Sequence, residues 1–221
     1  MPLRSRLDFT PRIYCLTLPG SARQKQMIPR LNDIGLPWEF VYGVYRPAPE
    51  NIEWDYIKNC DFIQRYPAAL YTTYLQGVAG CKDGFRRMLK KILADSDPYC
   101  LFCTDDVVFV PDFKKKLEDL IKKLPKNIGA CGLCHTMSLK CQQHVNYDFS
   151  KCVGRYRIDW LCIIRRWLVK HYLIAMETEG AESDVSFERY IKKSGHEIYI
   201  SNTQLADPSE ESNNSVIGYS L

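Results

Sequence analysis

Two adjacent carboxylates between two apolar runs constrain this chain more than any other feature of its sequence. Asp105 and Asp106 follow residues 99–103 (YCLFC) and precede residues 107–110 (VVFV), and both runs are typical of buried strands. An unpaired buried charge costs several kcal/mol, so the pair must lie at a strand end that faces water, a cation or a ligand. In an α/β sheet, ligands usually bind at the carboxyl ends of the strands.

The segments before this pair predict a βαβ unit. Residues 13–18 (IYCLTL) and 39–45 (EFVYGVY) are apolar runs rich in strand formers, and residues 22–34 between them have helical composition. Ser21 is suited to cap this helix and Gly35 to end it. A strand, a helix and a strand in this order imply two parallel strands joined by a right-handed crossover.

Further helices and strands alternate along the rest of the chain. An amphipathic helix is expected at residues 73–94, and Asp112 stands at the N-cap position of a helix that ends before Pro125. The remaining candidates are strands at 128–134, 138–141, 152–158, 160–164 and 197–201, and helices at 166–176 and 183–193. This order predicts an α/β fold with a mostly parallel central sheet flanked by helices.

The composition is typical of one globular domain. The chain has 221 residues, of which 46% are hydrophobic and 25% charged. We expect one domain over residues 1–221, with residues 1–11 as a peripheral lead-in and residues 202–221 as a peripheral tail that is mobile without a ligand. A net charge of +4 suits a phosphate-bearing ligand but not a nucleic-acid partner.

The hydropathy pattern predicts a cytoplasmic protein. No apolar stretch reaches the ~18 residues that a membrane span needs, so no stable membrane insertion is expected. The first twelve residues carry three arginines and an aspartate rather than the apolar core of a secretory leader. Without a secretory leader, the ten cysteines are expected to be reduced thiols.

Two cysteine pairs have the spacing of a structural zinc site. They are Cys100 with Cys103, and Cys131 with Cys134, the second followed by His135. Both pairs fall in runs that are typical of strands, where residues i and i+3 point to opposite faces. We therefore favour buried thiols and keep the zinc site as the alternative. His135 itself is a candidate for an acceptor pocket, for a metal site or for the protein surface.

An acidic residue at a helix start is a candidate general base. Asp184 lies in the first turn of a helix that Ser183 is placed to cap, so the helix dipole favours its ionised form. An ionised carboxylate beside an anchored diphosphate can accept a proton from an alcohol nucleophile. The alternative is that Asp184 and Glu182 only stabilise the start of the helix.

Several segments resemble glycosyltransferase family 25, the lipooligosaccharide galactosyltransferase-like group. Residues 13–46 resemble its N-terminal strand, helix and strand. GCKDGFRRML at 80–89 is similar to its G-C-x-x-S-H-x-x-x-L helix, and TDDVVFVPDF at 104–113 to its E-D-D-V-x-F-x-x-x-F segment. Residues 160–166 and 182–191 resemble its late strand and acidic helix start. Small viral enzymes of the GT-A fold look comparable.

This resemblance implies a single GT-A, Rossmann-like domain that transfers a sugar from a nucleoside diphosphate sugar, with UDP as the expected nucleotide. The acceptor is a hydroxyl on a glycan, and the reaction inverts the anomeric centre with Asp184 as base. By analogy the donor is bound by Thr17, Leu18, Arg23, Tyr45, Lys82, Thr104 and Asp105. Asp106, with Asp105, holds Mn²⁺ or Mg²⁺, because a hard cation takes carboxylate and phosphate oxygens.

Three positions differ from the family pattern. Thr104 replaces the first acidic residue of the E-D-D segment, and Gly84 and Phe85 replace the S-H pair.

Two other functions remain open. A nucleotidyltransferase also needs paired carboxylates and a metal ion, although residues 16–25 (LTLPGSARQK) hold a single glycine where such enzymes usually carry a glycine-rich phosphate loop. The non-catalytic alternative is a module stabilised by zinc on the four paired cysteines, with its basic helix faces on nucleic acid.

Overall fold

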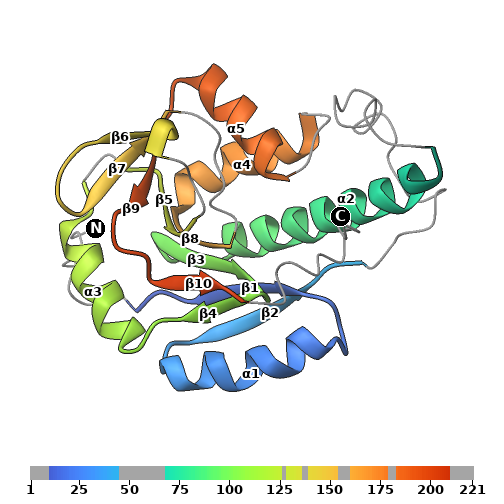
Figure 1. Ribbon diagram of the computed structural model, residues 1–221, viewed down its shortest axis with the longest axis horizontal. Coiled ribbons are helices and arrows are strands. Elements are labelled where there is room, and N and C mark those ends of the chain that lie inside the picture. The colour runs from blue at the N-terminus through green and yellow to red at the C-terminus, as the bar shows by residue number, and fades with distance from the viewer. Residues whose placement is uncertain are drawn as a thin grey trace.

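The computed structural model describes residues 10–44, 68–125, 128–135, 139–153, 160–178 and 183–209. Within these ranges, the side chains of residues 68–75, 78, 139, 184 and 185 also lie outside the description. In the described part, a central sheet lies between two layers of helices (Figure 1). No described helix combines the length and the hydrophobicity that a membrane crossing requires.

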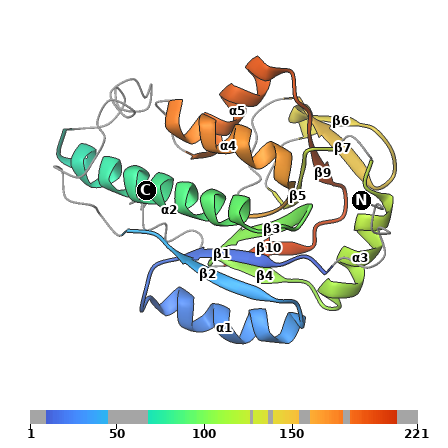
Figure 2. The same ribbon diagram turned by 180° about the vertical axis from the view of Figure 1, so that it is seen from behind.

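The described helices cover both faces of the sheet. Helix α1 lies on one face of the sheet, and α2, α4 and α5 lie on the other, as both views show (Figure 1, Figure 2). Their bounds are α1 (Ala22–Ile34), α2 (Ala68–Ala94), α3 (Phe113–Lys123), α4 (Arg166–Thr178) and α5 (Ser183–Ser194). The strands are β1 (Ile13–Thr17), β2 (Trp38–Tyr42), β3 (Tyr99–Thr104), β4 (Val107–Phe109), β5 (Ala130–Cys134), β6 (Gln142–His144), β7 (Phe149–Cys152), β8 (Leu161–Arg165), β9 (Ile198–Ser201) and β10 (Ala206–Pro208).

The central sheet is mixed, with the strand order β2-β1-β3-β8-β5-β9-β7-β6. Strand β1 is parallel to β2 and β3, and β5 is parallel to β9, whereas β8 and β7 are antiparallel to both of their neighbours. Strand β8 begins where β3 ends, and the backbone N–H of Thr104 donates to the carbonyl of Trp160 (3.1 Å). The predicted α/β class is confirmed, but the expectation of a mostly parallel sheet missed these two reversed strands.

The order of the strands reverses next to β1. Strand β2 pairs on one side of β1 after the crossover through α1, and β3 pairs on its other side after the crossover through α2. Helix α1, which follows β1, and helix α2, which leads into β3, cover opposite faces of the sheet (Figure 2). This arrangement is a topological switch point, where open α/β sheets usually bind ligands.

The two faces of the sheet carry separate hydrophobic clusters. The cluster under α1 and α3 contains Ile13 and Cys15 of β1, and the cluster under α2, α4 and α5 contains Tyr14 and Leu16. This alternation follows the two-residue period of a strand. Burial of both faces explains why the strands have continuous apolar sequences rather than alternating ones.

The four paired cysteines are buried in these clusters. Cys103 belongs to the cluster under α1 and Cys100 to the cluster on the opposite face, so the two thiols point away from each other. Cys131 and Cys134 share the α1 face because the pairing register shifts between Gly132 and Cys134. In the described ranges, no three or more His, Cys, Asp or Glu side chains are grouped to hold a metal ion. The favoured interpretation as buried thiols therefore fits the packing.

Helix α2 approaches the carboxyl ends of β1 and β2 very closely. A Cβ atom at Gly84 would lie 2.7 Å from Leu16 Cδ1 and 3.2 Å from the Cα of Gly43. The next residue, Phe85, is buried and lies 6.1 Å from both Phe102 and Tyr172, measured between ring centroids. Packing thus explains both residues that differ from the S-H pair of the family pattern.

Two predicted segments differ from the structure where it describes them. Of the strand expected at 138–141, residues Leu139–Cys141 form a short 3₁₀ helix. Of the strand expected at 152–158, only residues 152 and 153 are described, with Cys152 as the last residue of β7, and residues 154–158 lie outside the described residues. The tail expected to be mobile from Asn202 contains β10, which pairs antiparallel with β4. Pairing with β4 and the burial of Leu205 and Ala206 order this segment, and neither is visible in its local sequence.

Candidate functional site

The acidic turn, which we define as residues 104–106, lies at the carboxyl end of β3 beside the end of β1. The register of these parallel strands pairs Leu16 with Thr104. Thr17 Oγ1 donates a hydrogen bond to Asp105 Oδ2 (2.5 Å), and Thr104 Oγ1 donates to Asp106 Oδ1 (2.5 Å). Each carboxylate is therefore oriented by a hydroxyl group through one of its two oxygens.

Arg23 of α1 lies beside the other two oxygens. Its Nη1 is 4.0 Å from Asp105 Oδ1 and 3.8 Å from Asp106 Oδ2. Helix α1 begins close to the end of β1, where Ser21 Oγ accepts from the N–H of Gln24 (3.0 Å). The side chains of Arg23, Asp105 and Asp106 are 15%, 12% and 13% exposed, so water screens their charges only weakly. Two carboxylates thus face one guanidinium, which leaves an excess negative charge.

The pKa of Asp105 is raised, first by burial and to a smaller extent by the neighbouring carboxylate. Burial raises the pKa above its ordinary value, and the hydrogen bond from Thr17 opposes that effect. The neighbouring charge of Asp106 raises the pKa further, and Arg23 lowers it. A carboxyl group that is costly to ionise in the ligand-free protein gains from a bound cation. Perturbed carboxyl groups at a strand end of this kind are candidates for a functional site.

Two further contacts hold the acidic turn in place. Arg30 Nη1 donates to the carbonyl of Val107 (3.0 Å), and the N–H of Ser209 donates to the carbonyl of Asp106 (2.7 Å). Sequence reasoning missed both residues. Arg23 and Arg30 are seven positions apart, which places them on the same side of α1 two turns apart, and this spacing was a usable signal for Arg30. Nothing in the local sequence signals the contact of Ser209.

Lys82 is buried and bonded to another helix. It is 5% exposed, and its Nζ donates to the fully buried Ser186 Oγ of α5 (3.2 Å). Lys82 therefore links α2 to α5. Asp184 occupies the first turn of α5, but its side chain lies outside the description. Its role as base and the role of Lys82 in donor binding stay predictions.

The other predicted donor contacts lie in different surroundings. Leu18 follows β1, and its Cδ2 would lie 3.7 Å from a Cβ atom added at Gly43. The N–H of Gly43 donates to the carbonyl of Thr17 (2.9 Å). Leu18 thus borders the place where α2 meets the strand ends. Tyr45 lies outside the described residues. Whether these two residues contact a nucleotide stays a prediction.

His135 is a buried residue at the carboxyl end of β5, not a surface one. Its Nε2 lies 3.2 Å from the carbonyl of Ser201, and its backbone N–H donates to Gln204 Oε1 (3.0 Å). Burial lowers the pKa of His135, which favours the neutral ring. The residue thus fastens the segment that leads from β9 into β10.

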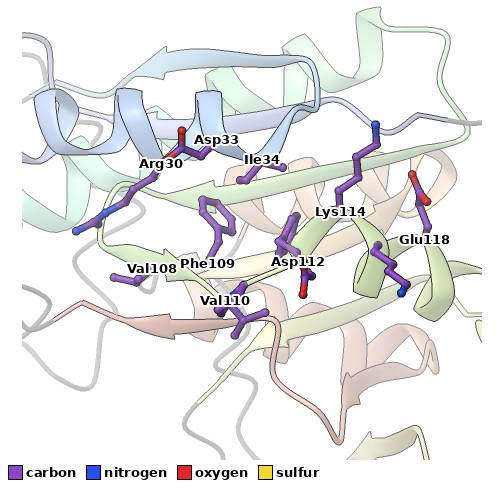
Figure 3. A pocket seen from close by; sticks show the side chains of 12 residues that line it. Arg30, Asp33, Ile34, Val108, Phe109, Val110, Asp112, Lys114 and Glu118 are labelled. Carbon is purple, nitrogen blue, oxygen red and sulfur yellow. The ribbon is translucent and has the colours of Figure 1, made fainter.

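A groove of about 710 Å³ lies between α1, β4 and the start of α3 (Figure 3), and none of residues 104–106 lines it. Arg30 lies at one end of the groove, and Val108 and Phe109 of β4 form part of its wall. Asp112 precedes α3 at the predicted N-cap position, but with a φ of 59° and without a capping hydrogen bond from its side chain. Arg30 lines the groove and also donates to the carbonyl of Val107, the residue that follows the acidic turn.

The donor set of the acidic turn fits a hard divalent cation that is shared with a phosphate. Such a cation is usually bound by one or two carboxylates and completes its shell with phosphate oxygens and water. Ligating carboxylates are in turn commonly hydrogen-bonded, as Asp105 and Asp106 are by the two threonines. Among the described residues, no group of three or more His, Cys, Asp or Glu side chains that could hold a metal ion is found.

Comparison with known proteins yields little. No family model matches the sequence, and no curated protein matches it. One similar solved structure is the crystal structure of a glycosyltransferase involved in the glycosylation of the major capsid of PBCV-1, with 11% sequence identity and a TM-score of 0.41. The match covers 76% of this chain and 66% of that chain, just under two thirds of its length. A likeness at this level establishes neither the family nor the activity of this chain.

Proposed function

We propose that this protein is a glycosyltransferase that transfers a sugar from a nucleoside diphosphate sugar to a hydroxyl group of a glycan. The observation that carries this proposal is the acidic turn at the switch point between β1 and β3, with both carboxylates oriented by threonines and faced by Arg23. We further propose a GT-A, Rossmann-like fold of the family 25 type and UDP as the nucleotide.

The residues of the turn have distinct roles in this proposal. Asp106 and Asp105 hold Mn²⁺ or Mg²⁺, and a bound cation supplies positive charge against the departing diphosphate. Thr17 and Thr104 fix the direction of the two carboxylates. Arg23 adds a second positive charge, and its guanidinium suits phosphate oxygens because it presents paired N–H donors.

The transfer itself needs a base for the acceptor. In the proposed inverting reaction, the acceptor oxygen forms a bond to the anomeric carbon while the bond from that carbon to the diphosphate oxygen breaks. The electron pair of the broken bond leaves with the nucleoside diphosphate, and Asp184 accepts the proton of the acceptor hydroxyl. The position of Asp184 in the first turn of α5 supports this role, because the helix dipole there favours a carboxylate.

A ligand screen tests the proposal. We expect UDP sugars or GDP sugars with Mn²⁺ to raise the melting temperature, because a ligand that binds only the folded state stabilises it. Asp106→Ala should lose this shift, and Asp119→Ala, a change of an exposed aspartate on α3, should keep it. No shift with any nucleotide across the panel would contradict the proposal. Release of pyrophosphate from a nucleoside triphosphate would indicate a nucleotidyltransferase instead.

A further inference from the structure

The four oxygens of the acidic turn are divided between two kinds of partner. One oxygen of each carboxylate accepts from a threonine hydroxyl, and the other faces Nη1 of Arg23. The oxygens that face Arg23 are Asp105 Oδ1 and Asp106 Oδ2. These two oxygens are the ones left for a cation held jointly by the pair. The guanidinium therefore faces the two oxygens that a jointly held cation would use.

Arg23 and a divalent cation are direct electrostatic competitors. The guanidinium stays charged at any ordinary pH, so it cannot yield its place by losing a proton. Arg23 and both aspartates are largely buried, so repulsion between Arg23 and an incoming cation is poorly screened. A cation such as Mn²⁺ has to push the guanidinium away from the carboxylates. Without another anion nearby, this displacement costs Arg23 its attraction to the two aspartates.

A diphosphate removes this obstacle. Its oxygens accept bidentate hydrogen bonds from a guanidinium and also ligate the cation. Arg23 lies in the first turn of α1, where the helix dipole further favours an anion over a cation. The diphosphate can therefore hold both positive groups at once, which the two aspartates alone cannot do.

We propose that Arg23 is a built-in counter-cation that suppresses the binding of a free divalent metal ion to the acidic turn until a nucleoside diphosphate is present. The proposal rests on the proposed function and adds an order to it: the metal ion enters with the nucleotide and not before it. By thermodynamic linkage, UDP and Mn²⁺ then raise each other's affinity by the same factor.

Titration of Mn²⁺ followed by electron paramagnetic resonance tests this order, because the signal of free Mn²⁺ is lost on binding. We expect wild-type protein to bind Mn²⁺ alone weakly and to gain roughly tenfold or more in affinity when UDP is added. Arg23→Gln should bind Mn²⁺ alone roughly tenfold more tightly than wild type and should gain less from UDP. Arg23→Lys, which keeps the charge, should stay close to wild type without UDP.

Two controls locate the effect. Arg87→Gln removes an exposed arginine of α2 that pairs with Asp83, and it should leave Mn²⁺ binding unchanged. Adding Asp106→Ala to Arg23→Gln should abolish the gained Mn²⁺ binding if the acidic turn is the site. Circular dichroism with a metal chelator present shows whether each variant is folded.

The outcomes separate this inference from the proposed function. Equal binding of Mn²⁺ alone by wild type and Arg23→Gln, with both proteins folded, overturns the counter-cation role. A gain in Arg23→Gln without any effect of UDP on either protein supports the counter-cation role and contradicts nucleotide binding. A gain in Arg23→Gln together with a UDP effect in wild type supports both.

Discussion

The two ends of β1 and β3 carry similar groups but differ in what those groups do. At the amino ends, Tyr14 Oη donates to Asp95 Oδ2 (2.6 Å), and Arg12 Nε lies 3.7 Å from the same oxygen. At the carboxyl ends, Thr17 donates to Asp105, and Arg23 lies close by. Each end thus combines a carboxylate, a hydroxyl donor and an arginine.

The difference lies in burial and in a second carboxylate. The hydrogen bond from Tyr14 is the main reason why the pKa of Asp95 is lowered, and burial opposes it only partly. At the other end, burial is the main reason why the pKa of Asp105 is raised, and Asp106 adds to it. The shifted pKa values mean that ionisation of Asp95 favours the folded state, whereas ionisation of Asp105 opposes it until a positively charged ligand binds. Binding sites commonly give up stability in this way.

The largest effect should be on ligand binding, when one carboxylate is neutralised at the carboxyl end and the result is compared with the same change at the amino end. We expect Asp106→Asn to weaken the binding of UDP with Mn²⁺ by at least about 100-fold, because direct ligands matter more than the outer-shell groups whose loss costs about 10–100-fold. Asp95→Asn should leave this affinity unchanged. Isothermal titration calorimetry measures both, and equal losses in the two variants would break the comparison.

A second test concerns how α2 approaches the two ends. Near the carboxyl ends, Gly84 lets the helix backbone contact Leu16 and Gly43, whereas Ile92, near the end of α2 that leads into β3, has a buried side chain. We expect Gly84→Ala to lower the free energy of unfolding by about 1–3 kcal/mol through overpacking. For a chain of this size, each kcal/mol lowers the melting temperature by about 2–4 °C.

The control for this test is an exposed position of the same helix. Lys90→Ala should change the melting temperature very little, because Lys90 is exposed and alanine is a good helix former. A Gly84→Ala protein as stable as wild type would mean that α2 can move away from the strand ends without cost.

The first βαβ unit and the acidic turn were predictable because their signals are local. Ser21 caps α1 and Gly35 ends it in the left-handed conformation that glycine favours, with a φ of 66°, so the helix has the predicted bounds. The position of Asp105 and Asp106 at a strand end followed from the cost of burying charge within an apolar run. Both arguments use only neighbouring residues.

The remaining features depend on contacts between distant segments. Strand β10 forms because Ala206 and its neighbours pair with β4, whose residues lie far earlier in the chain. The helical spacing of Lys82 from the buried Phe85 and Leu89 places it on the inner face of α2, but its partner, Ser186 of α5, lies 104 residues later in the chain. The reversed direction of β8 likewise follows from where the chain re-enters the sheet. No local pattern carries this information.

A smaller effect is expected from the hydroxyl group at the amino end. Tyr14→Phe should lower the free energy of unfolding at neutral pH by about 1 kcal/mol, because it removes the hydrogen bond to the ionised Asp95. Nucleotide binding should not change. Tyr147→Phe, at an exposed position, is the matched control for thermal melting. A loss of nucleotide affinity in Tyr14→Phe would show that the two ends are coupled.

The smallest effect, and the most direct test of the comparison, is the opposite pH dependence of the two aspartates. The folded pKa of Asp95 is below the unfolded value, so its stabilisation is present above the ordinary pKa of 3.8 and is lost as the pH falls through the folded pKa. The folded pKa of Asp105 is above the unfolded value, so its stabilisation is present below 3.8 and is lost as the pH rises through the folded pKa.

Substitution by asparagine should therefore shift stability in opposite directions at neutral pH. With a metal chelator present, Asp95→Asn should lower the melting temperature and Asp105→Asn should raise it, each by a few degrees, which corresponds to about 1 kcal/mol. The Asp105→Asn difference should shrink as the pH is lowered toward about 4, because the folded wild-type carboxyl group then becomes neutral. The Asp95→Asn difference should shrink only below 3.8, as the pH falls through the lowered folded pKa of Asp95. A lower melting temperature in Asp105→Asn at neutral pH would mean that Arg23 and Thr17 outweigh the cost of burying that charge, and the two ends would then be alike.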